Sequence, residues 1–76
     1  MLNERQDRFQ RIATNRTNKI LDMLRLLGNC SNTANYEYTS DEVKQIFSAI
    51  ESEVKVQKAK FTASKANKKF TLNGGE

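Results

Sequence analysis

Apolar residues recur at helical spacing along two long stretches of this chain, and no proline interrupts either stretch. The first stretch contains Phe9, Ile12, Ala13, Ile20, Met23, Leu24 and Leu27. The second contains Val43, Ile46, Phe47, Ile50, Val54 and Phe61, with Gln57 completing the spacing. Apolar positions three and four residues apart lie on one side of an α-helix, so each stretch predicts an amphipathic helix with one apolar stripe.

Local signals predict where the first helix begins and ends. Asn3 is a favourable N-cap residue, and Gln6 follows three residues later, as in a capping box. Gly28 comes directly after the last apolar residue, where a left-handed C-cap is expected. These signals predict a helix over about residues 4–27.

The start signal of the second helix is stronger. Thr39 can cap the backbone of Glu42 while the Glu42 side chain reaches back, and Tyr38 and Val43 are spaced as a hydrophobic staple. The second helix is therefore predicted over about residues 40–61.

An antiparallel arrangement lets every large apolar residue of one stripe meet an apolar residue of the other. It aligns Leu27 with Val43, for example, and Phe9 with Phe61. The predicted fold class is therefore all-α, an antiparallel two-helix hairpin that forms a domain of residues 1–61. Beyond Phe61 the stripe would continue through Lys65 and Lys68. Residues 62–76 are accordingly predicted to be a mobile, basic C-terminal tail.

The length of the chain limits its core. A chain of 76 residues buries only about 60% of its unfolded surface, so its stability needs a supplement. Cys30 is the single cysteine and histidine is absent, which excludes an intrachain disulfide and a Cys/His zinc site. No metal and no cofactor is expected. Self-association into a helical bundle, or docking on a partner, is the remaining supplement.

Catalysis is not expected, and no catalytic residue is assigned. Without histidine, general-base chemistry would fall to carboxylates or lysines, and most carboxylates here are explained by helix caps or helix pairs. Neither a signal peptide nor a membrane-spanning run is expected, because Arg25 interrupts the most apolar segment. The expected location is the cytoplasm.

Four residues are candidates for contact with a partner or a second copy: Leu21, Leu26, Tyr36 and Arg16. Leu21 and Leu26 flank the first stripe and so suggest a second contact surface, although single exposed leucines are common. Arg16 lies inside the stripe. Either its stem packs while its head reaches a carboxylate such as Glu51 or Glu53, or it sets the register of an interface. Tyr36 belongs to an asparagine- and tyrosine-rich link that is either structural or a recognition loop.

A net charge of +4 and a pI near 9.5 predict a weak attraction to phosphates. Basic residues on the outward side of the first helix, extended by the tail, are candidates for phosphate contact: Arg8, Arg11, Lys19, Arg25, Lys65, Lys68 and Lys69. The usual interpretation of such residues is a solvated face. No helix-turn-helix or zinc finger accompanies them, so contact with the nucleic-acid backbone is the most that they predict.

Two segments carry a family resemblance. Residues 24–32 read L-R-L-L-G-N-C-S-N and residues 35–39 read N-Y-E-Y-T. With the surrounding residues 8–61, they resemble a family of small helical proteins of bacteria, phages and mobile elements that share an L-R-x-x-G-N-x-S-N…N-Y-x-Y-T core. Such proteins carry leucine or a similar residue where this chain has Cys30. The resemblance implies a phage or mobile-element setting but no reaction, ligand or catalytic residue.

Together these features predict a small non-enzymatic interaction protein. Its expected partner is a protein or a nucleoprotein, bound through helical surfaces, and it is expected to form a homo-oligomer. The alternative is a nucleic-acid-associated accessory protein that contacts phosphates through the first helix and the tail.

Overall fold

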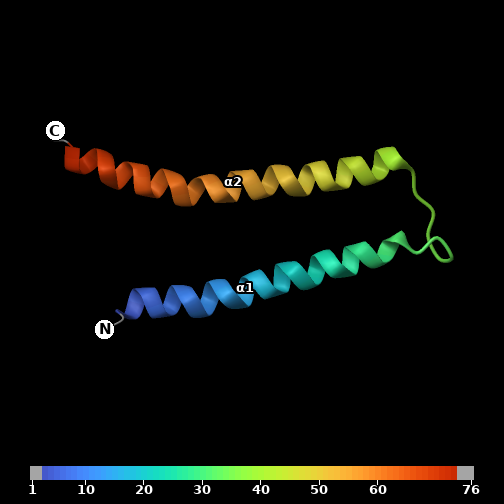
Figure 1. The fold of residues 1–76 in the computed structure, drawn as a ribbon, viewed down its shortest axis with the longest axis horizontal. Coiled ribbons are helices and arrows are strands. Elements are labelled where there is room, and N and C mark those ends of the chain that lie inside the picture. Colours follow the sequence, from blue (N-terminus) through green and yellow to red (C-terminus); the bar gives the residue numbers. More distant parts are fainter. Residues whose placement is uncertain (1–2, 74–76) are drawn as a thin grey trace. The chain divides into compact units, whose positions relative to one another are not determined.

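The protein is all-α, as predicted. The computed structural model describes the backbone of residues 3–73 and the side chains of residues 3–63. It contains the helix α1 (Glu4–Gly28), a short 3-10 helix η1 (Asn29–Ser31) and the helix α2 (Ser40–Asn73) (Figure 1). No strand occurs within this part of the chain. The chain divides into two compact units, Met1–Glu37 and Tyr38–Glu76. The antiparallel pairing of the two helices stays a prediction.

The start of α1 agrees with its predicted cap. Asn3 has an extended backbone, and its side-chain Oδ1 accepts a hydrogen bond from the backbone N–H of Gln6 at 2.7 Å. Glu4 and Asp7 lie in the first turn, where the helix dipole favours negative charge. The cap and the dipole together explain why a helix begins at Glu4.

The end of α1 differs from the prediction. Gly28 is the last residue of the helix and has right-handed helical angles, φ −60° and ψ −28°. The predicted left-handed C-cap at Gly28 is therefore wrong. Instead the backbone N–H of Asn29 is directed toward the carbonyl oxygens of Arg25, Leu26 and Leu27. The chain then continues into the 3-10 helix η1. A 3-10 turn satisfies carbonyl groups at a helix end by hydrogen bonds between residues three apart, so no left-handed residue is needed.

Asn32 organises the turn that follows η1. Its backbone carbonyl accepts the N–H groups of Asn35 and Tyr36 at 3.1 and 3.0 Å. Its side-chain oxygen accepts the N–H of Ala34 at 3.0 Å, which is an Asx turn. For Asn32 the structural interpretation of the asparagine-rich link is therefore confirmed.

The start of α2 carries the predicted capping box in full. The backbone N–H of Thr39 donates to Glu42 Oε1 at 2.8 Å, and the backbone N–H of Glu42 donates to Thr39 Oγ1 at 3.1 Å. Two N–H groups that the helix cannot satisfy internally are thereby paired.

We expect Thr39→Ala to destabilise the start of α2 by about 1 kcal/mol, because the Glu42 N–H loses its acceptor. Amide hydrogen exchange at Glu42 and Val43 should accelerate accordingly. The control is Ser48→Ala, which removes a hydroxyl from an exposed position inside the same helix and should leave that exchange unchanged. Equal exchange in the Thr39 variant and the wild-type protein would mean that the box contributes nothing.

The end of α2 also differs from the prediction. The helix runs to Asn73, well past the expected end near Phe61, so that predicted end is wrong. The segment contains neither glycine nor proline before Gly74, and its alanines and lysines favour helix strongly. The mobility of the tail stays a prediction, and residues 74–76 lie outside the described residues.

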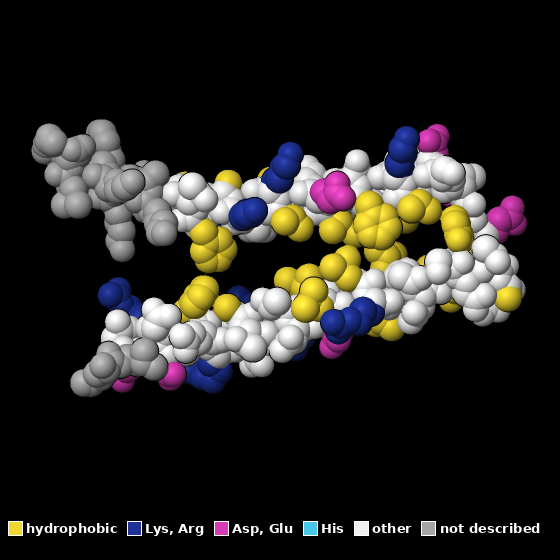
Figure 2. Space-filling view, viewed as in Figure 1, with side chains coloured by type: hydrophobic (Ala, Val, Ile, Leu, Met, Phe, Trp, Pro, Cys, Tyr) yellow, Lys and Arg dark blue, Asp and Glu magenta, His cyan; other side chains and the backbone are white. Residues whose placement is uncertain are grey.

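Each helix has an apolar stripe on one side. The members with described side chains are half-buried or exposed, and no residue with a described side chain is fully buried. Ile12, Ala13, Leu24 and Leu27 are the half-buried residues of α1. Among residues 40–63 of α2, whose side chains are described, Val43 and Ile50 are half-buried. Hydrophobic side chains gather along one side of each helix (Figure 2). The α1 stripe is defined as Phe9, Ile12, Ala13, Ile20, Met23, Leu24 and Leu27. The α2 stripe is defined as Val43, Ile46, Phe47, Ile50, Val54 and Phe61.

Candidate partner-binding surface

The strongest candidate site is the C-terminal part of α1. Six of the eight residues from 20 to 27 are apolar: Ile20, Leu21, Met23, Leu24, Leu26 and Leu27. We call these eight residues the leucine segment. At about 100° per residue, Leu21 and Leu26 fall on opposite flanks of the α1 stripe. The segment is therefore apolar around most of its circumference, which is usual for a helix covered on several sides.

The apolar residues of the leucine segment are accessible. Leu26 retains 59% of its surface and Leu21 retains 40%, while Ile20 and Met23 are also exposed. Leu24 and Leu27 are half-buried. Removing apolar surface from water contributes roughly 25 cal/mol per Å², so a partner that covers this segment gains considerable free energy.

The two charged residues of the leucine segment neutralise each other. Arg25 Nη1 lies 2.9 Å from Asp22 Oδ1, and both side chains are exposed. At about 100° per residue they fall on the side of α1 opposite the stripe, and their spacing of three residues makes them neighbours there. Such an exposed pair contributes little stability. Its consequence is that the leucine segment carries no net charge within an otherwise basic helix.

Tyr36 belongs to the same unit as the leucine segment. Its side chain is 53% exposed, and its backbone N–H is fixed by the Asn32 carbonyl. A tyrosine held on an ordered turn offers a large contact area with little loss of side-chain entropy. The turn thus fixes the backbone of Tyr36 without covering its ring.

Arg16 lies on the α1 stripe and is exposed. It has no hydrogen bond or ion pair within the part of the chain whose side chains are described. In the other unit, Gln57 occupies an equivalent polar position on the α2 stripe. Its Nε2 donates to Glu53 Oε2 at 2.5 Å, one helical turn earlier. The α1 stripe is therefore interrupted by a cation, Arg16, and the α2 stripe by an amide that is hydrogen-bonded to the carboxylate of Glu53.

The predicted phosphate-contact residues are only partly placed. Arg8, Arg11, Lys19 and Arg25 are all exposed on α1, but Arg25 is paired with Asp22. Lys65, Lys68 and Lys69 are part of α2, but only their backbone is described and their side chains are not.

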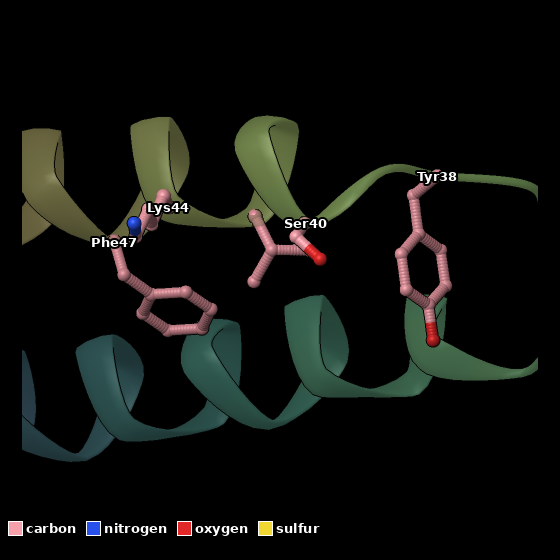
Figure 3. Close-up of a pocket in the computed structure, with 5 residues that line it drawn as sticks. Tyr38, Ser40, Lys44 and Phe47 are labelled. Atoms are coloured by element: carbon pink, nitrogen blue, oxygen red, sulfur yellow. The ribbon is translucent and has the colours of Figure 1, made fainter.

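A shallow apolar pocket lies at the start of α2 and was missed by the sequence analysis. Tyr38, Ser40, Val43, Lys44 and Phe47 line about 500 Å³ of space. The rings of Tyr38 and Phe47 point to the same side of the segment (Figure 3). The predicted staple of Tyr38 and Val43 was the signal that could have located it, because a staple places two apolar side chains around a helix start.

The described side chains include no group of three or more Asp, Glu or Cys that could hold a metal ion. Cys30 is exposed and is not in a disulfide. Among the described residues, no helix combines the length and the apolar character needed to cross a membrane.

Comparison of the chain with protein-family models, with curated proteins and with solved structures yields no match in any of the three. The resemblance to small helical proteins of phages and mobile elements therefore stays a prediction.

Proposed function

We propose that the protein is a small non-enzymatic interaction protein, from a phage or other mobile element of bacteria, that binds a protein or nucleoprotein partner. The observation that carries the proposal is the leucine segment. Its apolar residues are accessible around most of the helix, and its two charges neutralise each other. No catalytic step is part of the proposal.

The binding mode that fits this segment is a helix held in a groove. In that mode an amphipathic helix inserts apolar side chains spaced three, four and seven residues apart into an apolar groove. The flanking residues Leu21 and Leu26 contact the two walls of the groove. Tyr36, on the ordered turn beyond η1, adds an aromatic contact at the edge.

The alternative function is phosphate contact by a nucleic-acid-associated accessory protein. The exposure of Arg8, Arg11 and Lys19 on α1 favours it. Three such contacts predict that the logarithm of the binding constant falls with the logarithm of salt concentration with a slope of roughly −2 to −3. The internal pairing of Arg25 with Asp22 reduces the charge that α1 has left for phosphates.

An affinity capture separates the two functions. Tagged protein is incubated with lysate of the source cells, with and without nuclease, at low and at raised salt. We expect the captured partner to survive nuclease and moderate salt, because apolar burial depends little on ionic strength. Capture that nuclease abolishes, with salt dependence at the slope given above, would replace the proposal with the alternative.

A further inference from the structure

The polar interruptions of the two stripes are chemically complementary. Arg16 on the α1 stripe offers a guanidinium with five N–H donors. On the α2 stripe, Glu53 accepts one hydrogen bond from Gln57 and keeps further acceptor sites on its carboxylate. The Gln57 carbonyl oxygen is a second acceptor beside it. One chain thus carries both a cationic donor and an anionic acceptor, each placed on or beside an apolar stripe.

We propose that a second copy of this chain covers the two stripes, and that Arg16 of each copy binds the Glu53–Gln57 pair of the other. A two-fold symmetric dimer uses the same patch on both copies, so a residue and its complement must both be present on one chain. This chain meets that requirement. The two symmetric contacts satisfy both guanidinium groups and both carboxylates at once.

The apolar area is sufficient for such a dimer. The exposed members of the two stripes retain between 42% and 64% of their surface: Phe9, Ile20, Met23, Ile46, Phe47, Val54 and Phe61. At roughly 200 Å² for a fully exposed side chain of this size, they present about 800 Å² per chain. A stable protein interface of standard size buries about 800 Å² on each partner.

The polar contact has a separate role from the apolar area. A single polar position within an apolar helical seam specifies the register and the number of helices, at some cost in stability. The bond between Gln57 and Glu53 orients the carboxylate beforehand. The Arg16 contact therefore selects one alignment of the two copies. Leu21 and Leu26 lie outside the seam, whereas Ile20, Met23, Leu24 and Leu27 belong both to the seam and to the leucine segment. A second copy and the partner of the proposed function therefore compete for that face of α1. The dimer is measured on the purified protein without any partner, so its test does not depend on the proposed function.

The test uses two charge-reversal variants of the full chain, Arg16→Glu and Glu53→Arg, and measures the dimer by sedimentation over a concentration series. Each variant alone places like charges at both contacts of the dimer, so we expect its dissociation constant to rise about a hundredfold. An equimolar mixture of the two variants restores opposite charges at both contacts. We expect the mixture to form a heterodimer nearly as stable as the wild-type dimer.

The mixture distinguishes contact between copies from contact within one chain. Pairing within one chain would leave the mixture as weak as its components, while the double variant Arg16→Glu with Glu53→Arg would recover. That result overturns the proposal, as does a wild-type protein that stays monomeric at micromolar concentration. The matched control is Arg11→Glu, the same charge change on an exposed residue outside the stripe. An equal loss in this control also overturns the proposal.

Discussion

Replacing Leu21 and Leu26 together with serine is expected to weaken partner capture strongly while the protein stays helical. Complete burial of a leucine side chain contributes about 1.5–3 kcal/mol. Because Leu21 and Leu26 still expose 40% and 59% of their surface, the two replacements together should remove about 1.5–3 kcal/mol of binding free energy. That loss corresponds to a drop in affinity of roughly 10- to 150-fold. Titration of the captured partner against each variant measures the drop, and far-UV circular dichroism monitors the helix.

Two further variants make this result specific. Thr14→Ser with Asn18→Ser introduces the same residue type on the opposite, polar side of α1, where both positions are exposed. It should leave the affinity within about twofold of wild type, since surface substitutions change little. Replacing Arg8, Arg11 and Lys19 with glutamine should mainly slow association and reduce its salt dependence. If the leucine variant binds normally and the glutamine variant does not, phosphate contact becomes the better account.

The features that were predicted correctly from the sequence are local. The box of Thr39 and Glu42 involves residues three positions apart, and both of its hydrogen bonds are present. The cap at Asn3 is equally local. Such bonds depend on side-chain chemistry and short-range geometry, which neighbouring residues specify completely. For the same reason the two helices and their starting points could be predicted.

The two wrong helix ends have a common origin. Gly28 permits a left-handed backbone but does not require one, and the 3-10 turn through Asn29 satisfied the same carbonyls. The predicted end near Phe61 assumed that a helix stops where its apolar stripe stops. The spacing of apolar residues indicates where the packed surface of the helix ends. The helix itself continues further, because Ala63, Ala66 and the neighbouring lysines have a high intrinsic helix propensity.

The candidate site was predicted in part. Leu21, Leu26 and Tyr36 were identified from their places outside the stripe and in the link, and all three are exposed. The pairing of Asp22 with Arg25 was not foreseen, although a spacing of three residues allows it. The bond between Gln57 and Glu53 was also missed, because the sequence shows neither which rotamers the two side chains adopt nor which neighbour each one selects. These pairings change which charges remain available for an interface.

An aspartate in the α2 stripe is expected to have the largest effect on the fold itself. Ile50 is half-buried at the centre of that stripe, and a carboxylate there must be taken out of water without a partner. The cost of several kcal/mol is comparable with the whole stability of a small domain. Ile50→Asp should therefore lose both self-association and most of its helical ellipticity at micromolar concentration.

Val56→Asp is the matched control, with the same charge on the same helix but at an exposed position outside the stripe, and it should shift stability by less than about 0.5 kcal/mol. Circular dichroism and sedimentation on both variants measure the difference. Equal losses would mean that the stripe has no special part in folding, and equal retention would mean that nothing packs against Ile50.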